Sequence, residues 1–463
     1  MRWTRRVDAR RVVLPALAAL AIGSAAIWIA APISGAVTTG REQDPAPGGG
    51  VRAGGRPAGQ HRDRVTALLT DLVAVPTPYG TSAAEAQRLL AGLFERAGFS
   101  VQVTTDDPAA LADHPEFMPP AAWTERGVNL VAAPPPGRAA PIALFAHIDT
   151  ERAGQGWTSP PTSAVVRDGR MYGLGTADSK AGVAAAVVAA LALAEAGRPA
   201  PTVVIIHGKG GGARGSLPVF ARLKGPRASV YVHPAETGNG MAEVKHSSRG
   251  VLDLVLTVTG WRGRPREAGT PESAPYGEGG DALQACVRLL EAVRAQTPPG
   301  AAFNVGRLAA GERPGTVPDR CQAEMRFLFE SGTAQAILTQ VEAALGEAAR
   351  RLETPQGRFA WSLVAPGTRS NPAGVDWNAP LCRLVRRSIA EVTGAEPVSY
   401  TNHMTSDIRF PIRAAGLPSV GIGSKGGNFS RADEWIDLDD LVRLVDVLML
   451  VAGGAGDLPA SGR

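Results

Sequence analysis

Cysteine is scarce in this sequence, which contains three in 463 residues, at positions 286, 321 and 382. These cysteines form no CxxC pair, so at most one disulfide can form, and we expect all three to be buried structural residues. A fixed repeat is also absent, since the 55 glycines and 37 prolines follow no period that would indicate a collagen-like or low-complexity chain. With 44% hydrophobic and 20% charged residues, the composition excludes wholesale disorder. The length predicts two or three domains.

The body of the chain lacks an excess of either charge. The formal net charge is +5, and residues 2–11, with five arginines and one aspartate, supply +4 of it. The basic character therefore belongs mostly to the start of the chain. Because the remainder is nearly neutral and has no basic stretch rich in aromatic residues, we expect no nucleic-acid partner.

Residues 12–36 follow the arginines without a single charged side chain. A basic stretch before an apolar segment of this length predicts export, with the arginines inside and the rest outside. Residues 1–36 are then a signal peptide, with small residues suited to cleavage after Ala36, or an uncleaved membrane anchor. Either way the protein is extracytoplasmic and meets the membrane only through this segment. Residues 37–60, rich in Gly, Pro and Ala, predict a flexible linker.

From about residue 61 apolar strands without alternation are separated by helices, which predicts a buried central sheet with helices on both faces. We assign this mixed α/β sheet to residues 61–248 and 365–455. Residues 249–364 instead show the order β-α-β-β-α-β, which predicts an inserted split βαβ domain. The predicted helices cover 63–74, 83–97, 181–196, 217–223, 281–296, 333–352, 380–392 and 438–452, and the strands 101–105, 128–132, 141–147, 202–206, 229–232, 251–260, 302–308, 321–330, 359–364 and 419–423.

Three side chains with metal-binding chemistry lie at the ends of predicted elements. His147 and Asp149 follow an apolar strand, and Asp178 lies in a Gly-rich turn that opens a helix. Strand periodicity places His147 and Asp149 on one face, at the sheet edge where α/β folds bind ligands. A histidine and a carboxylate suit a cation such as zinc, and a second carboxylate can orient the histidine ring. A structural, hydrogen-bonded histidine is the alternative.

The wider spacing resembles the zinc aminopeptidase-like exopeptidases and deacylases, which include carboxypeptidase G, succinyl-diaminopimelate desuccinylase and the aminoacylases. The family pattern is H-x-D, then W near P, then D-G-x-x-Y-G-x-G-x-x-D-x-K-x-G. It is matched here by His147, Asp149, Trp157, Pro160, Asp168, Gly169, Tyr172, Gly173, Gly175, Asp178, Lys180 and Gly182. The resemblance covers nearly all of residues 61–455. It implies that the split βαβ insert is a lid or dimerisation domain, and hence a homodimer.

Several positions depart from the family pattern. The family's Glu-Glu pair, a general base and a metal ligand, aligns with Gly210 and Gly211, and its last histidine ligand aligns with Ser430 ahead of Glu434. Its acidic ligand before a proline is His233 here, and its lid histidine becomes Arg264. Glycine side chains can neither accept a proton nor bind a cation.

The resemblance therefore leaves His147, Asp178 and His233 as metal ligands, with Asp149 behind them as a catalytic residue. Three protein ligands and a water suffice for one catalytic zinc, so the centre is atypical and mononuclear, although the family pattern allows one or two ions. His207, Lys209 and Glu236 are candidates to replace the lost base, with solvent-facing loop residues as the alternative. Arg264 is a candidate oxyanion or carboxylate partner. Arg409 and His403 are candidates for substrate binding.

Two hypotheses follow. The first is an exported metal-dependent amidohydrolase or exopeptidase that acts on a small peptide or an N-acylated amino acid. The second is a catalytically inactive relative, without a metal, that binds a ligand or partner outside the membrane. The retained His147, Asp149 and Asp178 favour the first, and the four replaced positions favour the second.

Overall fold

The computed structural model describes residues 58–81, 83–105, 111, 114–117, 127–209, 215–261, 280–312, 317–353 and 358–460, with side chains from His61 onward. The predicted leader, Gly210, Gly211 and Arg264 lie outside these residues. The first helix, α1, spans Ala58–Ala74 and so begins inside the predicted linker. Among the described residues, one helical stretch, Thr176–Glu195, is long and apolar enough to cross a membrane. Because 89% of its most apolar window is buried inside the protein, it is a core helix.

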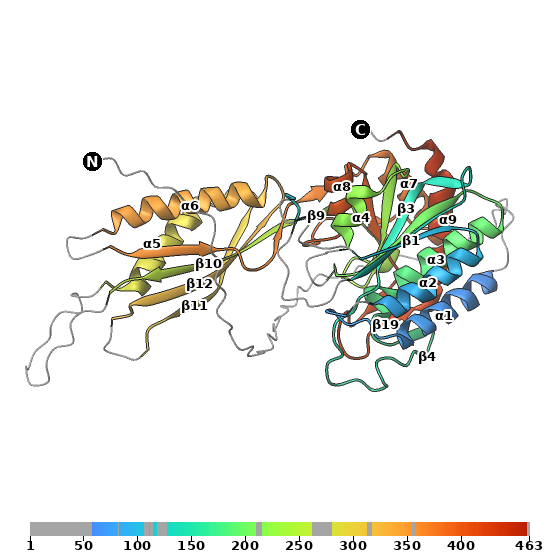
Figure 1. The fold of residues 1–463 in the computed structure, drawn as a ribbon, viewed down its shortest axis with the longest axis horizontal. Coiled ribbons are helices and arrows are strands. Elements are labelled where there is room, and N and C mark those ends of the chain that lie inside the picture. The colour runs from blue at the N-terminus through green and yellow to red at the C-terminus, as the bar shows by residue number, and fades with distance from the viewer. Residues whose placement is uncertain are drawn as a thin grey trace, which may run out of the picture. The chain divides into compact units, whose positions relative to one another are not determined.

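One mixed sheet forms the centre of the α/β part (Figure 1). Its strands are Ser100–Thr105 (β1), Val128–Ala133 (β2), Ala139–His147 (β3), Ala200–Ile206 (β6), Ala228–Val232 (β7), Glu243–Lys245 (β8), Val398–Tyr400 (β16) and Ser419–Ile422 (β17). They lie in the order β1-β2-β6-β3-β7-β17-β8-β16. β3 pairs in parallel with β6 and β7, whereas β2 pairs antiparallel with both β1 and β6. The predicted mixed sheet is confirmed.

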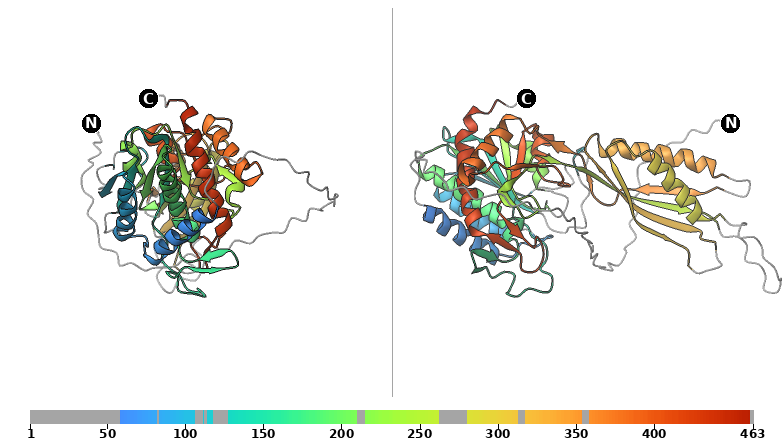
Figure 2. Two further views of the ribbon diagram at one scale, coloured as in Figure 1. Left: turned by 90° about the vertical axis from the view of Figure 1, so that its right-hand side faces the viewer. Right: turned by 180° about the vertical axis from the view of Figure 1, so that it is seen from behind.

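Helices pack on both faces of this sheet because its central strands are apolar on both sides (Figure 2). Leu144 of β3 belongs to one hydrophobic cluster and its neighbour Phe145 to another. The Leu144 cluster includes α1 and the helices Ala84–Arg96 (α2), Ala181–Glu195 (α3), Pro380–Thr393 (α7) and Leu438–Gly454 (α9). The Phe145 cluster includes the helices Ser216–Arg222 (α4) and Arg409–Ala415 (α8).

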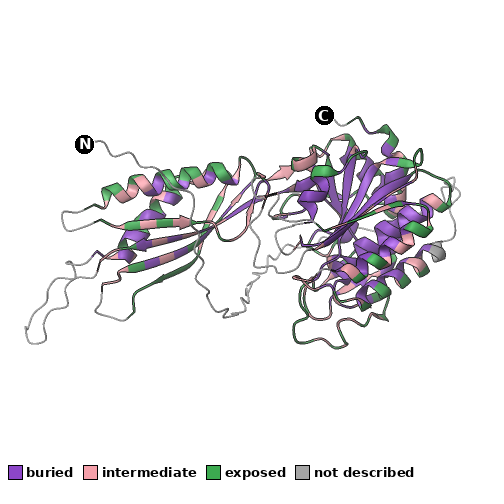
Figure 3. Cartoon of the chain, in the orientation of Figure 1, coloured by how far each residue is buried: buried purple, intermediate pink, exposed green. Residues whose placement is uncertain are grey.

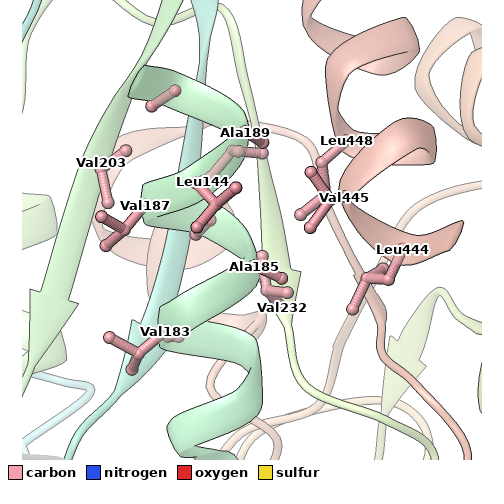
Figure 4. Close-up of a cluster of buried hydrophobic side chains, with 14 of the residues drawn as sticks. Leu144, Val183, Ala185, Val187, Ala189, Val203, Val232, Leu444, Val445 and Leu448 are labelled. Atoms are coloured by element: carbon pink, nitrogen blue, oxygen red, sulfur yellow. The ribbon is translucent and has the colours of Figure 1, made fainter. Parts of the chain in front are cut away.

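Helix α3 is the most deeply buried of these helices, with alanines and valines around its whole circumference (Figure 3). In Figure 4, Val187 of α3 lies near Leu144 and Val203 of the sheet. Small residues let the helix approach the sheet closely, since a Cβ at Gly182 would lie 1.9 Å from the carbonyl oxygen of Val232. This contact places the start of α3, and the turn before it, against the carboxyl end of β7.

The inserted domain has the predicted order of elements. Its members are Gly250–Thr259 (β10), Ala282–Ala295 (α5), Ala302–Ala310 (β11), Arg320–Phe329 (β12), Ala334–Arg351 (α6) and Ala360–Val364 (β13). The antiparallel sheet order is β11-β12-β10-β13, with α5 and α6 in one hydrophobic cluster with the sheet. Asp281 and Thr333 cap the two helices with side-chain oxygens. The predicted end of this domain, residue 364, comes too early, because Arg369–Ser370 (β14) also pairs with β10.

The sequence patterns missed a small four-stranded sheet beside the centre. It consists of Val165–Arg167 (β4), Arg170–Tyr172 (β5), Gly426–Gly427 (β18) and Trp435–Asp437 (β19), in the order β18-β19-β5-β4. Strands of two or three residues are too short to show a period, so their pairing depends on the tertiary fold. Glu434 directly precedes β19. The three cysteines are buried and free, as expected.

Candidate metal centre

Three predicted ligands converge where strands of the main sheet end. His147 is the last residue of β3, His233 follows β7, and Asp178 lies in the turn Thr176–Lys180 before α3. One ligand atom from each residue lies within 4.8 Å of the other two. The Oδ1 atom of Asp178 is 2.7 Å from Nε2 of His147 and 2.9 Å from Nε2 of His233. Because β3 and β7 are parallel neighbours, their carboxyl ends bring both rings to the same edge.

Backbone carbonyl groups orient both rings from behind. Nδ1 of His147 is 3.0 Å from the carbonyl oxygen of Asp149, and Nδ1 of His233 is 2.8 Å from that of Pro234. We assign the Nδ1 protons to these hydrogen bonds, which turns both Nε2 atoms toward Asp178. The carboxylate of Asp149 also lies behind His147, 3.6 Å from Nδ1. This support from behind is typical of metal-binding histidines.

The turn that carries Asp178 is held by a buried carboxylate, Glu434. Its oxygens accept the backbone N–H groups of Gly175, Ala177 and Asp178 at 2.8–2.9 Å. Burial raises the pKa of Glu434 to about 8, although the bonds from these N–H groups lower it. Lys180 supports the other side of the turn, since its ammonium donates to the carbonyl oxygens of Leu72 and Val75.

Lys209, which follows β6, extends its side chain into the centre. Its Nζ lies 3.0 Å from Oδ1 of Asp178 and 2.9 Å from Nε2 of His233. Burial lowers the pKa of Lys209, but Asp178, Asp407 and Glu236 outweigh this effect and leave it raised, so the group is an ammonium. The side chains of Lys209 and Asp178 are 17% and 13% exposed, so the centre is nearly closed to solvent.

The charges of the centre follow from this arrangement. Burial alone would raise the pKa of Asp178, but Lys209, His233 and His147 hold it well below its usual value. Burial, Lys209 and Lys245 hold the pKa of His233 well below its usual value, so this ring is neutral. Burial and Lys209 lower the pKa of His147, but Asp178 and Asp149 more than offset them. Asp178 is thus a carboxylate, and the Lys209 ammonium is its cationic partner.

A second buried lysine, Lys245 of β8, borders the centre. Its Nζ donates to the carbonyl oxygen of Pro234 at 3.1 Å and lies 3.5 Å from Nδ1 of His403. Burial lowers the pKa of Lys245 to about 7. Nε2 of His403 lies 3.6 Å from a carboxylate oxygen of Glu236, whose side chain is 54% exposed. His403 and Glu236 thus connect the buried centre to the surface.

The donor set fits one divalent ion. Two imidazole nitrogens and a carboxylate oxygen are the ligands that zinc prefers, and both rings carry the backbone support that metal-binding histidines need. Among the described residues, three such side chains lie close enough to share an ion, those of His147, Asp178 and His233. His147, Asp178 and His233 would hold the ion, which would supply a Lewis acid at this edge of the sheet.

The other predicted site residues are distributed as follows. His403 lies at the edge of the centre, and Asp149 acts behind His147 without facing the shared ligand position. His207, the residue after β6, is buried and packs against Gly127, where a Cβ would lie 2.0 Å from its Nδ1. Arg409 is buried beside Phe410 and Asp407 rather than among the ligands. Arg264, Gly210 and Gly211 lie outside the described residues.

Sequence reasoning missed Lys245, Tyr79, Glu151 and the positioning role of Glu434. Tyr79 and Glu151 lie within electrostatic reach of Asp149 and Asp178, and burial together with these carboxylates raises the pKa of both. Lys245 carried no signal in the sequence, because its short strand Glu243–Lys245 contains two charged residues and is followed by His246. Strand register, which the sequence does not show, carries it to His233.

Comparison with known proteins supports the architecture. The sequence model described as peptidase family M20/M25/M40 matches residues 143–453. Succinyl-diaminopimelate desuccinylase of Methylobacterium radiotolerans is 27% identical over 417 residues, which cover 84% of this chain and 97% of that protein. The same enzyme of Methylococcus capsulatus is 26% identical over 332 residues, covering 68% of this chain and 84% of that protein.

Solved structures show the same fold. A tripeptidase from Staphylococcus aureus matches with a TM-score of 0.66 at 18% identity, covering 85% of this chain and 98% of that chain. Aminopeptidase PepT from Bacillus cereus also has a TM-score of 0.66 at 18% identity, with 86% and 99% covered. A Bacillus subtilis protein described as a dinuclear metal-binding peptidase has a TM-score of 0.57 at 14% identity, with 85% and 98% covered.

Proposed function

Because the chain belongs to peptidase family M20/M25/M40, we propose that it hydrolyses an amide bond in a small peptide or an N-acylated amino acid. Family membership supports a metallopeptidase or amidohydrolase as the general class. The substrate class is chosen from the family's relatives, which include desuccinylases and peptidases. The atypical centre, with one ion in place of two, is also part of this proposal.

The observation that carries the proposal is the convergence of three ligand atoms within 4.8 Å, from His147, Asp178 and His233. A bound divalent ion would polarise the amide carbonyl and lower the pKa of a water molecule. The chain's own part is to hold the ligands still. Two backbone carbonyl groups fix the rings, and Glu434 fixes the turn of Asp178.

Proton transfer needs a group that replaces the family's glutamate base. We assign this role to Glu236, whose partly exposed carboxylate lies 3.6 Å from His403 and within electrostatic reach of Lys209 and Lys245. A carboxylate at the edge of the centre can accept a proton and return it to the leaving amine. His207 is a weaker candidate, because its ring packs against Gly127.

One observation favours the second hypothesis, an inactive binding protein. The ammonium of Lys209 already supplies a positive charge between Asp178 and His233. Ser430, at the position of the family's last histidine ligand, has no imidazole with which to bind a second ion. In this alternative the centre recognises a ligand through the same residues without cleaving it.

We further propose that the protein works outside the cytoplasmic membrane and forms a homodimer. The uncharged stretch 12–36 behind five arginines supports export. The split βαβ insert, which resembles a lid or dimerisation domain, supports self-association. Cell fractionation with N-terminal sequencing tests export and cleavage after Ala36, and light scattering of the purified protein tests the dimer.

The decisive experiment measures metal content and turnover together. Purified protein is analysed for bound metal and then assayed against dipeptides, tripeptides and N-acyl amino acids, including N-succinyl compounds. We expect turnover that requires zinc, cobalt or manganese and that is lost in His147→Ala. The matched control is His246→Ala, because this histidine bonds to Val375 and Ser399 outside the centre. Absence of turnover with every metal would leave the inactive binding protein.

A further inference from the structure

Lys209 makes two contacts that a metal ion at this centre would need for itself. Its Nζ is 2.9 Å from Nε2 of His233 and 3.0 Å from Oδ1 of Asp178. Both are atoms of the candidate ligand set. The lysine therefore does not merely lie near the ion's position but bonds to the same donor atoms.

The contact with His233 occupies the lone pair that a metal bond would use. A neutral imidazole has one proton and one ring lone pair that can accept. Nδ1 of His233 lies 2.8 Å from the carbonyl oxygen of Pro234 and 3.2 Å from Nζ of Lys245. With the Nδ1 proton donated to the nearer carbonyl group, the lone pair of His233 is on Nε2, where it accepts from Lys209. That lone pair is the one that would bind zinc. In the opposite tautomer Nε2 carries a proton and binds no metal either.

The spacing of the ligand atoms agrees with a hydrogen-bonded centre. The 2.7 Å between Asp178 and His147 is a hydrogen-bond length. Oδ1 of Asp178 and Nε2 of His233 are both acceptors 2.9 Å apart, and the Lys209 ammonium bridges them by donating to each. Around tetrahedral zinc with bonds of about 2.0 Å, neighbouring ligand atoms lie about 3.3 Å apart. An ion would therefore require the ligands to open slightly as Lys209 leaves.

We propose that the Lys209 ammonium is an internal cation that competes with a divalent ion for this centre, so that metal binds only when the Lys209 side chain swings out. Two carboxylates, Glu236 and Asp407, lie within electrostatic reach of Lys209 and could receive its charge. Glu236 is the more accessible, whereas Asp407 is buried and accepts from Ser216. The proposal rests on the proposed function only in assuming that the centre takes a divalent ion.

The test compares zinc affinity in full-length wild-type, Lys209→Met and Lys209→Arg proteins, measured by titration against a competing chelator. Methionine keeps the length of the side chain but removes its charge and its donors. In Lys209→Met, zinc no longer has to displace a hydrogen bond from a charged donor. We therefore expect zinc to bind about 10- to 100-fold more tightly to this variant. Arginine keeps a positive charge, so Lys209→Arg should remain close to wild type. The matched control is Lys224→Met, an exposed lysine outside the centre.

The melting temperature gives a second readout, which like the zinc titration does not depend on activity. We expect added zinc to raise the melting temperature of Lys209→Met more than that of wild type, because no ammonium must be displaced. Zinc binding that appears only in Lys209→Met would support this inference and overturn metal-dependent hydrolysis by the native protein. Equal affinity in wild type and Lys209→Met would overturn the inference and leave the proposed function standing. Absence of zinc binding in every variant would overturn both.

Discussion

The carboxylate of Glu434 accepts the backbone N–H of Asp178 at 2.8 Å, across 256 residues of sequence. It accepts two more N–H groups of the same turn, from Gly175 and Ala177. The position of the central carboxylate is therefore set from a distant segment, directly ahead of β19. A turn rich in glycine cannot hold such a geometry alone, because glycine allows many backbone conformations.

This relationship predicts the effect of Glu434→Gln. At pH 9, above the pKa of about 8, Glu434 is a carboxylate and both of its oxygens accept from the turn. Glutamine keeps one oxygen acceptor but turns an NH2 group toward buried N–H donors. At about 1–3 kcal/mol for each buried donor left without a partner, we expect the free energy of unfolding to fall by about 2 kcal/mol. We also expect weaker zinc binding, because Asp178 loses its anchor. Urea unfolding and zinc titration measure the two effects. The exposed Glu391→Gln is the control, and equal values for both variants would refute this role.

The substitution Asp149→Asn tests whether the carboxylate of Asp149 supports the ring of His147. The carboxylate lies 3.6 Å from Nδ1 of His147, while the ring's hydrogen bond goes to the backbone carbonyl of the same residue. The substitution keeps the shape and the carbonyl but removes the charge. Groups that orient a metal ligand typically contribute about 10- to 100-fold to metal affinity, so we expect zinc affinity to fall by a factor of that size. Asp71→Asn, an exposed aspartate on α1, serves as the control. Unchanged zinc affinity would show that the carboxylate plays no part.

The same substitution at two helical glycines should have opposite effects. Gly182→Ala would place a Cβ 1.9 Å from the carbonyl oxygen of Val232, so α3 must move away from β7. We expect a destabilisation of about 1–3 kcal/mol or more. At Gly346 of α6 the nearest atom to an added Cβ is 3.8 Å away, so alanine should stabilise by about 0.5–1 kcal/mol. Chemical unfolding of both variants checks the signs, and a stabilising Gly182→Ala would contradict the close packing.

Lys180 predicts a pH dependence of stability. Burial lowers its pKa to about 8 in the folded chain, against a usual value of 10.5, and Glu434 partly offsets this. Between these values the unfolded chain binds the additional proton, so stability rises with pH over this window. The difference corresponds to a gain of up to about 3 kcal/mol. Lys180→Gln should lack this gain, which unfolding at pH 8, 9 and 10 would reveal. Parallel pH profiles for the two proteins would exclude the effect.

Much of the framework could be predicted because its signals are local. Long apolar strands, the alanine-rich helix ending at Gly197 and the β-α-β-β-α-β order all appear as patterns within short windows. The candidate metal ligands could also be predicted, since His147 and His233 lie directly at strand ends and Asp178 lies in the turn that opens a helix. Parallel strands bring such ends together, so convergence of these three residues was expected.

The charged side chains around these candidate ligands could not be predicted in the same way. Lys209 and Lys245 lie on different segments, and either could have faced solvent. Lys245 reaches His233 only because β8 joins the sheet beside β17, next to β7. Glu434 reaches Asp178 through strands of two or three residues that show no period. Side-chain contacts of this kind depend on register and turn geometry, which no short window encodes.

The sequence by itself determined the α/β architecture and the order of elements in the insert, and it named the three candidate ligands, because hydrophobic period and residue type are properties of the chain. Tertiary structure alone decided which positive charge meets those ligands and which carboxylate holds their turn. The physical reason is that burial turns a lysine ammonium or a glutamate carboxylate from a solvated surface group into a partner that must be satisfied. Only the assembled fold specifies where that partner lies.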